Sequence, residues 1–357
     1  MSLKEKLKEL PSSPGVYLMR DSLKSIIYVG KSKNLKNRVS SYFQNSKSHS
    51  PKVIKLVKNL KDFSCIYTDT EFEALMLECK LIKAINPLYN RQMKNPKSYC
   101  YIKITTSEEY PKIDISSEYL KDDKNIYFGP YTSTNTIRNA LQGLKEYYKI
   151  SCNTGFRRNS SCLNYSLGLC RGICLNKLSR KNYLNLITKI TGILKGADKS
   201  ILEELKYKMN MYSQKFDFEN AAKYRDYIAS IGYTINRYKI IKFARCNKNI
   251  VLLEHLGHGV VKFFLIKGNK VPFSKKYELK NFALKKLKSD LKSKILLYFN
   301  ARSQEKPIYI DKYEIDEFQI IYTYLKNKSR NCSYVIIAED LLDNKDSGID
   351  SELDKLF

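Results

Sequence analysis

The sequence predicts a mixed α/β (α+β) protein with several domains. Its 357 residues exceed the usual size of one domain. Short apolar runs of strand length alternate with longer amphipathic stretches of helical period. Hydrophobic residues make up 43% of the chain, which is enough to bury a core in each part. We expect four parts, with boundaries at residues 1–97, 98–200, 201–235 and 236–357.

The first part begins with a β-hairpin and continues with helices and a strand. Apolar runs at residues 16–19 and 26–29 flank a polar turn, which is the hairpin pattern. Asn34 is placed to cap the next helix, because its side chain can accept from an unpaired backbone N–H. We expect a further helix over residues 52–60 and a strand over residues 63–67. These elements predict a small α/β unit.

The helix expected over residues 71–85 holds the most informative residue. Thr70 and Glu73 form a capping box at its start. Glu78 projects from the middle of an apolar stripe made of Ala74, Leu75, Leu81, Ile82 and Ile85. A buried carboxylate is costly unless a cation or hydrogen-bond donors compensate it. Glu78 is therefore either part of a core salt bridge with Lys or Arg, or a ligand of a divalent metal.

The rest of the chain has weaker signals. Residues 98–200 are typical of a linker region of mixed structure that carries a cysteine cluster. Two amphipathic stretches, residues 201–213 and 218–231, predict an antiparallel helical hairpin. The last part is expected to be a further α/β domain. Its strands are expected at residues 260–266 and 334–338, and its helix near residues 279–298.

The charge balance favours a nucleic-acid partner. The formal net charge is +28, from 64 Lys and Arg against 36 Asp and Glu. Such an excess favours binding to a polyanion, and nucleic acid is the usual one. Ribosome-associated and membrane-surface proteins share this property, and a lysine excess can also be a solvated face.

No segment is typical of a membrane span or a signal peptide. Residues 1–10 are charged and lack an apolar core. The most apolar stretch, residues 249–267, is interrupted by Glu254, His255, His258 and Lys262. We expect a cytoplasmic protein without a membrane partner, whose nine cysteines do not form a disulfide framework.

Two tripeptides in the first part combine tyrosine with glycine. They are Gly15-Val16-Tyr17 and Tyr28-Val29-Gly30, and Lys31, Arg38 and Tyr42 follow closely. In phosphodiester hydrolysis, cations suit the charge that builds on the phosphate, and a polar group must take a proton from water. Tyrosine can be that base only beside positive charge, because its reference pKa is about 10. Each tyrosine alone could equally be an ordinary strand residue.

Together these residues resemble the GIY-YIG nuclease superfamily and, within it, the UvrC family of excision-repair endonucleases. The resemblance extends over residues 10–235, and its clearest segments are residues 10–19, 27–35, 68–75 and 87–90. Two departures stand out. Valine replaces isoleucine in both tripeptides, and Asn95-Pro96-Lys97 stands where two aspartates usually precede the lysine.

The resemblance implies roles for particular residues. Glu78 is implied to be the single protein ligand of a catalytic Mg²⁺ or Mn²⁺, with water and phosphate oxygens completing the shell. Tyr28 is the implied general base, with Tyr17 the alternative. The residues implied to stabilise charge, orient water or shape the pocket are Lys31, Arg38, Tyr42 and Asn90.

Four cysteines lie close together in the second part: Cys152, Cys162, Cys170 and Cys174. Their spacing, C-x9-C-x7-C-x3-C, is not a common zinc pattern, and from the residues alone both a metal site and buried free thiols stay open. The resemblance to the UvrC family implies a [4Fe–4S] cluster, for which four thiolates are the needed number. Zinc is the alternative.

Residues 202–235 resemble the UVR motif, through which UvrC engages UvrB. The core of the motif is Phe218-Glu219, Ala221-Ala222 and Arg225-Asp226. The resemblance implies that UvrB is a partner; the alternative is a helical hairpin that only links two domains.

Full-length members of the family also have an RNase H-like nuclease and helix–hairpin–helix elements. Neither is recognisable in residues 236–357, where Asp311, Glu339 and Asp340 at expected strand ends are typical of loop solvation. The resemblance thus implies a shortened, metal-dependent endonuclease that cuts damaged double-stranded DNA on the 3′ side of a lesion. The alternatives are a non-catalytic protein that binds DNA or UvrB, and a GIY-YIG nuclease of mobile DNA or restriction.

Overall fold

The structure is a computed structural model with two compact units. One unit consists of Met1–Pro96 together with Phe243–Phe357, and the other of Lys97–Lys242. The described residues are 3–44, 50–94, 99–121, 123–150, 163–175, 177–279, 284–299, 310–311, 313–327, 331–343 and 348–357. Within them, no helix is long and apolar enough to cross a membrane.

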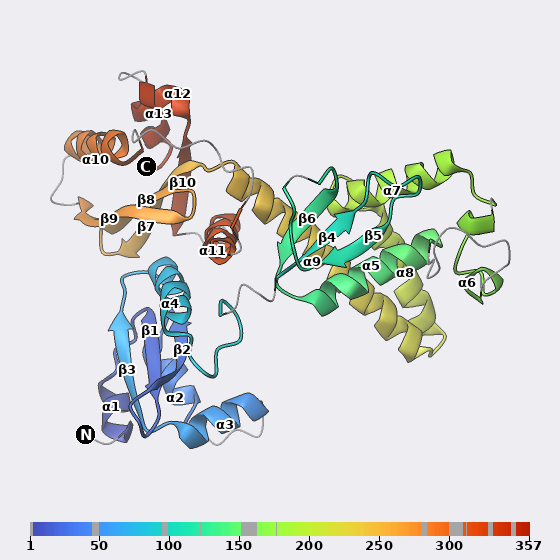
Figure 1. Cartoon of the computed structure of the whole chain (residues 1–357). Coiled ribbons are helices and arrows are strands. Elements are labelled where there is room, and N and C mark those ends of the chain that lie inside the picture. Colours follow the sequence, from blue (N-terminus) through green and yellow to red (C-terminus); the bar gives the residue numbers. More distant parts are fainter. Residues whose placement is uncertain are drawn as a thin grey trace. The chain divides into compact units, whose positions relative to one another are not determined.

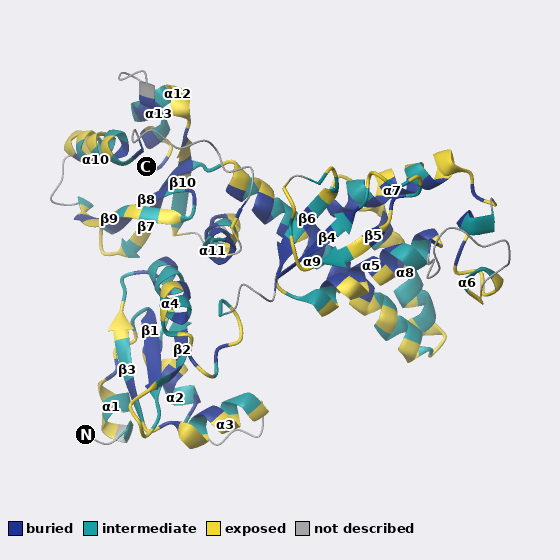
Figure 2. Cartoon of the chain, viewed as in Figure 1, coloured by how far each residue is buried: buried dark blue, intermediate teal, exposed yellow. Residues whose placement is uncertain are grey.

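The N-terminal part of the first unit has the expected sheet and helices (Figure 1). Its elements are α1 (Leu3–Glu9), β1 (Gly15–Arg20), β2 (Ile26–Ser32), α2 (Leu35–Ser41), α3 (Pro51–Asn59), β3 (Asp62–Tyr67) and α4 (Glu71–Ile85). The sheet order is β2-β1-β3, and both pairings are antiparallel. The central strand β1 is buried on both faces (Figure 2). The predicted hairpin, helices and strand of this part are confirmed.

Helix caps explain where α2 and α4 begin and end. The side chain of Asn34 accepts from Asn37 N–H at the start of α2, as predicted. Thr70 likewise accepts from Glu73 N–H at the start of α4. The carboxylate of Glu73 accepts from Asp69 N–H, one residue before the position that a capping box would use. Helix α4 ends at Asn86, whose φ of 52° is left-handed.

Helix α4 is apolar on two faces, and only one of them was expected. Ala74 and Ile82 pack against Val16 and Val29 of the small sheet, with Leu81 and Ile85 beside them, which confirms most of the stripe predicted around Glu78. Leu75 was placed in the wrong stripe, because it packs on the opposite face of the helix. The other face carries Phe72 and Cys79, which are buried in a second core. The residues of that second core that come from the C-terminal part are Ile250, Leu252, Phe264, Ile266, Ile320, Ile321 and Leu325.

The C-terminal part of the first unit forms a sheet with helices on both faces. Its elements are β7 (Asn249–Gly257), β8 (Val260–Lys267), β9 (Lys270–Glu278), α10 (Leu284–Phe299), α11 (Ile315–Lys326), β10 (Cys332–Ile337), α12 (Glu339–Asp343) and α13 (Gly348–Asp354). The order is β10-β7-β8-β9, antiparallel throughout. Alternate residues of β7 and β8 point to opposite faces, so one face packs on α10 and α13 and the other on α11 and α4.

The second unit is a folded domain, although its first half was expected to be a linker region. Its elements are β4 (Cys100–Ile104), β5 (Ile113–Ser116), β6 (Ile126–Tyr131), α5 (Thr134–Tyr148), α6 (Leu163–Ser166), η2 (Ile173–Leu175), α7 (Arg180–Leu194), α8 (Ser200–Gln214) and α9 (Phe218–Arg245). The sheet order is β5-β4-β6, and one apolar core runs from this sheet through α5, α7, α8 and α9.

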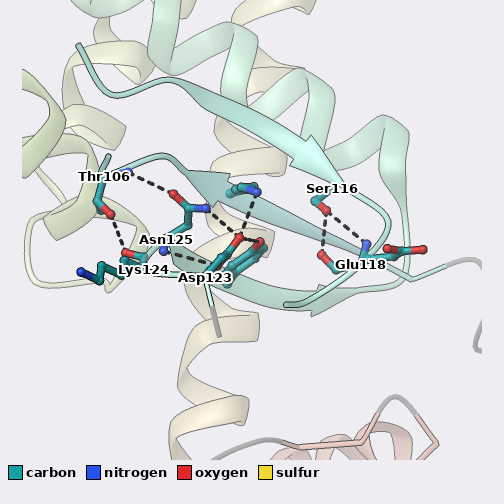
Figure 3. Close-up of polar contacts among 8 residues, drawn as sticks. Thr106, Ser116, Glu118, Asp123, Lys124 and Asn125 are labelled. Carbon is teal, nitrogen blue, oxygen red and sulfur yellow. Dashed lines mark hydrogen bonds and ion pairs between the residues drawn. The ribbon is translucent and has the colours of Figure 1, made fainter. Parts of the chain in front are cut away.

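Side-chain hydrogen bonds hold the loops at the ends of β5 and β6 (Figure 3). Thr106 donates from its backbone to Asn125 and from its hydroxyl to the Lys124 carbonyl. Asn125 in turn donates to Asp123, and Glu118 N–H donates to the Ser116 hydroxyl. Asp123 also accepts from the Tyr127 hydroxyl, so these contacts tie the turns to strand β6.

Helix α9 corrects one prediction. It was expected to end near residue 231 but runs to Arg245, across the expected boundary at residues 235 and 236. The helical pattern continues because buried residues recur at the spacing of one helix face; they are Ile231, Ile235, Ile240, Ile241 and Ala244. The break at residues 215–217 that precedes α9 is confirmed, with Phe216 at a φ of 60°.

Candidate active site

Three tyrosines from three elements meet beside the small sheet. Tyr17 lies on β1, Tyr28 on β2, and Tyr42 directly follows α2. The hydroxyls of Tyr17 and Tyr42 are 2.8 Å apart and share a hydrogen bond. The ring of Tyr28 lies 6.1 Å from that of Tyr17 and 6.4 Å from that of Tyr42, measured between centroids. The sequence therefore brings these candidate residues together in space.

Arg38 supplies the positive charge at this cluster. Its Nε donates to the Tyr17 hydroxyl over 3.3 Å, and its Nη2 donates to the Tyr42 hydroxyl over 3.2 Å. Its guanidinium also lies 5.0 Å from the centre of the Tyr42 ring. Arg38 and Tyr42 can meet because they are one helical turn apart at the end of α2.

The two glycines of the tripeptides make room for this arrangement. A Cβ at Gly30 would lie 2.4 Å from the Tyr17 hydroxyl oxygen, since Tyr17 and Gly30 are paired across β1 and β2. A Cβ at Gly15 would lie 2.4 Å from the Ile66 carbonyl oxygen. Glycine is therefore required by close approach at both positions.

Glu78 is half-buried in the apolar stripe and has no cationic partner among the described residues. Its Oε1 accepts from the backbone N–H of Lys31 over 3.0 Å. Burial raises the pKa of Glu78 above the ordinary glutamate value, and the Lys31 hydrogen bond and the charges of Lys31 and Arg38 oppose this only in part. In the part of the chain that the structure describes, the salt-bridge interpretation of Glu78 is thus wrong.

The ammonium of Lys31 lies elsewhere. It pairs with Glu71, at the start of α4, over 2.5 Å. The sequence analysis did not identify Glu71 as a partner of Lys31. The feature that could have indicated it is its place as an acidic residue in the first turn of the helix that carries Glu78. Asn90 is buried and uses its amide on the backbone of Val29, accepting over 2.9 Å and donating over 2.8 Å. Lys31 and Asn90 therefore brace β2 and α4 in this structure.

Tyr17 and Tyr28 keep their protons at neutral pH. Burial raises the pKa of Tyr17 and of Tyr28 above the ordinary tyrosine range, and the neighbouring phenols raise both further. Arg38 lowers them, but less than burial raises them. Arg38 supplies the positive charge that a tyrosine base needs, but in this structure burial outweighs its effect on the pKa of both phenols.

A divalent cation fits Glu78 as a single protein ligand. The described residues contain no group of three or more His, Cys, Asp or Glu that could enclose a metal ion. A cation at Glu78 would need water and substrate oxygens for the rest of its shell, which suits Mg²⁺. The carboxylate of Glu78 is half-buried, has a raised pKa and has no paired ammonium among the described residues. A cation bound there would compensate a negative charge that is costly to bury.

Only half of the cysteine cluster falls on described residues. Cys170 is buried and pairs with Ile150 in an isolated β-bridge, and Cys174 is half-buried in η2. Cys152 and Cys162 lie outside the described residues, as do Asn95-Pro96-Lys97.

The carboxylates considered in the last part do not form a second site in the described residues. Asp311 accepts from the Tyr313 backbone and is exposed. Glu339 and Asp340 lie exposed in the first turn of α12. This agrees with their expected role at loop and helix ends.

The hairpin of α8 and α9 presents aromatic side chains to solvent. Phe216 is 79% exposed and Phe218 is 64% exposed, and their rings are 6.2 Å apart. Arg225 pairs with its neighbour Asp226 at the surface. Two neighbouring exposed phenylalanine rings form an apolar patch, which marks a candidate contact surface.

Three family models match this chain in order. Residues 13–91 match the UvrC-like GIY-YIG domain, residues 99–192 the middle domain of the UvrC/Cho excinuclease, and residues 199–234 the UvrB/uvrC motif. Among solved structures, one of the GIY-YIG N-terminal endonuclease domain of UvrC from Thermotoga maritima, bound to its catalytic divalent cation magnesium, is 34% identical. It covers 25% of this chain and 94% of that chain, with a TM-score of 0.23.

Curated relatives align along most of the chain. UvrABC system protein C of Clostridium perfringens is 37% identical over 329 residues, which are 90% of this chain and 53% of that protein. The protein of the same name from Clostridioides difficile is 38% identical over 334 residues, which are 91% and 55%. The chain thus spans about half the length of the curated relatives it matches. These relatives and the three models agree with the resemblance seen in the sequence: the chain is similar to UvrC proteins along most of its length, and it carries the GIY-YIG, middle and UVR segments in the same order.

Proposed function

We propose that the protein is a metal-dependent DNA endonuclease of nucleotide excision repair that hydrolyses a phosphodiester on the 3′ side of a lesion. The observation that carries this proposal is Glu78. Its carboxylate is half-buried and lacks a cationic partner among the described residues. It is close enough to Tyr28 to raise the pKa of that phenol, and close enough to Arg38 for the guanidinium to lower the pKa of Glu78. Perturbed carboxylates of this kind cluster at functional sites.

The residues of the site divide the chemistry between them. Glu78 would hold the Mg²⁺ or Mn²⁺ ion, which when bound supplies positive charge to the phosphate and a more acidic water. Arg38 adds charge that is fixed in place by the hydroxyls of Tyr17 and Tyr42. Tyr28 is only half-buried and is the proposed general base, with Tyr17 the alternative. Because burial raises the pKa of Tyr28, its phenol can act as a base only after it has lost its proton, which the positive charge of a bound cation would favour.

The proposed substrate is damaged double-stranded DNA. The net charge of +28 supplies long-range attraction to a polyanion. The relatives are named as component C of the UvrABC system, and the preference for a lesion and for its 3′ side follows from that likeness. A silent scaffold that only binds DNA is less well supported, because every candidate catalytic residue type is present and Tyr17, Tyr28, Tyr42 and Arg38 are in mutual contact.

We further propose that the hairpin of α8 and α9 binds UvrB. Exposed Phe216 and Phe218 at its tip give an apolar surface that a partner hairpin could bury. Phe218→Ala with Arg225→Glu should weaken UvrB binding in a pull-down and leave DNA cutting unchanged. Undiminished binding would mean that UvrB does not bind through these residues, and a wild-type chain that binds no UvrB would favour a nuclease that acts without it.

The cysteine cluster is proposed to hold a [4Fe–4S] cluster, with zinc as the alternative. Cys170 and Cys174 are separated by three residues on the same short segment, and neither forms a disulfide among the described residues. Their distance in sequence from Tyr28 and Glu78 suggests a structural or redox role and not hydrolysis. We also propose that the protein acts in the cytoplasm, where free thiols persist.

The proposed activity is tested by its dependence on metal. A labelled duplex with one defined lesion is incubated with the full chain in EDTA and then in Mg²⁺ or Mn²⁺, with and without UvrA and UvrB. Cutting should appear only with the cation. Absence of cutting under every metal would favour the non-catalytic alternative, and cutting of undamaged DNA at one sequence would favour a restriction-type nuclease.

A further inference from the structure

Helix α4, which carries Glu78, is held at its N-terminal end by a lysine from the C-terminal sheet. Lys262 of β8 has a side chain that is only 8% exposed. Its ammonium lies 2.5 Å from Asp69 Oδ2 and 2.5 Å from Glu73 Oε1. These carboxylates flank the N-cap residue Thr70, so this lysine contacts the cap of the helix. Asp69 also pairs with the exposed Lys276, over 2.7 Å. The Lys262 contact is the specific one, because a buried ammonium is costly without carboxylate partners.

The C-terminal end of α4 is held by another ion pair. Lys83, in the last turn, has its ammonium 2.5 Å from Glu317 Oε2 and 3.9 Å from Asp316 Oδ2, both on α11. It also donates to the Tyr313 carbonyl. Each of these side chains is less than one quarter exposed, so solvent screens the pair only in part.

Between the ion pairs, the outer face of α4 is packed into the core of the C-terminal part. Phe72 is 1% exposed, and its ring centre lies 5.2 Å from that of Phe264 and 5.0 Å from that of Tyr324. Cys79, next to Glu78 in sequence, is fully buried in the same core. The C-terminal part therefore contacts α4 along its whole length.

We propose that residues 243–357 are a clamp that fixes α4 and thereby sets the affinity of Glu78 for a divalent cation, with Lys262 and Glu317 as positioning residues. This proposal rests on the proposed metal-binding role of Glu78. Neither residue touches the reacting groups; both act through the helix.

The physical reason is that Glu78 would be the single protein ligand. Metal–oxygen distances tolerate errors of only about 0.2 Å, and no second protein ligand could correct a displaced carboxylate. The Glu78 Oε1 position is fixed on one side by Lys31 N–H, 3.0 Å away on β2. The position of Oε1 also depends on where α4 lies. That helix is held by Lys262 of β8 at its start, and by its own Phe72 and Lys83, which contact the C-terminal part.

Binding of Mn²⁺ to the full chain, followed by electron paramagnetic resonance without any DNA, tests the clamp. Lys262→Met keeps an apolar stem in the buried position but removes the ammonium, and we expect it to weaken Mn²⁺ binding by roughly tenfold, as loss of an outer support of a metal ligand typically does. Glu317→Gln should weaken it less, since the amide can still accept from Lys83. Lys286→Met, an exposed lysine of α10, is the matched control and should change nothing.

A second control separates positioning from general stability. Ile190→Ala removes a fully buried side chain from the core of the other unit, so it should lower the melting temperature and leave Mn²⁺ affinity unchanged. Lys262→Arg, which keeps a cation between the two carboxylates, should recover most of the affinity. If Lys262→Met does not fold by circular dichroism, Glu317→Gln carries the test, and Lys262→Arg serves as the conservative control that should keep the wild-type affinity.

The outcomes are distinguishable. Wild-type protein that binds no Mn²⁺ would contradict the proposed function itself. Wild-type binding with unchanged affinity in the folded clamp variants would overturn the clamp alone. Equal weakening by Ile190→Ala would also overturn it, because the effect would then follow stability and not the position of α4.

Discussion

The backbone N–H of Lys31 donates to Oε1 of Glu78 over 3.0 Å, which joins strand β2 directly to helix α4. The side chain of the same lysine contacts Glu71 at the start of that helix. One residue therefore fixes α4 at two points while leaving the Glu78 carboxylate without a paired ammonium among the described residues. A carboxylate held by an N–H and not by a cation keeps its negative charge available for a metal ion.

Tyr28→Phe should slow cutting strongly and leave DNA binding unchanged. The variant keeps the ring that packs beside Tyr17 and Tyr42 but loses the hydroxyl. Loss of a proton-transfer group typically costs about 10²–10⁴-fold in rate. Single-turnover cutting measures the rate, and a salt titration of binding measures phosphate contacts, whose slope should match that of the wild type. An unchanged cutting rate would shift the role of base to Tyr17.

Gly30→Ala should disrupt the site through Tyr17. The added Cβ would lie 2.4 Å from the Tyr17 hydroxyl, which cannot swing away because Tyr42 and Arg38 hold it. Such overpacking typically costs about 1–3 kcal/mol. We expect a lower free energy of unfolding in urea and slower cutting. Gly192→Ala in α7 is the matched control: its Cβ meets nothing within 4 Å, so it should not destabilise the protein.

Glu254 should make the stability of the first unit fall as pH rises. The pKa of Glu254 is raised from 4.5 to about 7, mainly by burial; Glu73 and Glu71 add to this rise, and Tyr324 and Lys262 oppose it. Because the folded protein holds the proton more tightly than the unfolded chain does, this contribution is complete below pH 4.5 and is lost as pH rises through about 7. Urea unfolding of the wild type and Glu254→Gln at pH 5.5, 6.5 and 7.5 tests this. The free energy should decline more steeply with pH in the wild type; parallel curves would argue against the raised pKa.

The cysteine cluster can be tested by elemental analysis. Protein purified without oxygen should be brown and contain iron and sulfide in near-equal amounts, because a [4Fe–4S] cluster has four of each. Cys170→Ser with Cys174→Ser should be colourless. Zinc without iron in the wild type would replace the iron–sulfur cluster with a structural zinc site.

Local signals made the first part predictable from the sequence. The caps at Asn34 and Thr70, the two apolar runs that flank the hairpin turn and the stripe around Glu78 all act within a few residues. The tyrosine cluster followed because β1 and β2 are a hairpin and α2 comes directly after it.

What could not be predicted depends on contacts between distant segments. Phe72 and Cys79 looked like ordinary helix residues, since their partners in β8 and α11 come much later in the chain. Hydrophobic periodicity could not predict the ion pair of Lys262 with Asp69 either, because these residues lie far apart in the chain. The sign of the pKa shift of Tyr28 also depended on burial, which outweighs the charge of Arg38.

The most direct measurement maps the cuts made by the wild type and by Glu78→Gln on a duplex with one lesion, in Mg²⁺ and with UvrA and UvrB present. The wild type should make one incision, on the 3′ side of the lesion, because we propose a single catalytic centre among the described residues, in the segment that matches the GIY-YIG domain. Glu78→Gln should bind the DNA normally and cut at least about 10²-fold more slowly. Glu118→Gln, an exposed glutamate beside β5, should cut like the wild type. Cutting by Glu78→Gln at the wild-type rate and position would contradict the assignment of Glu78 as the metal ligand.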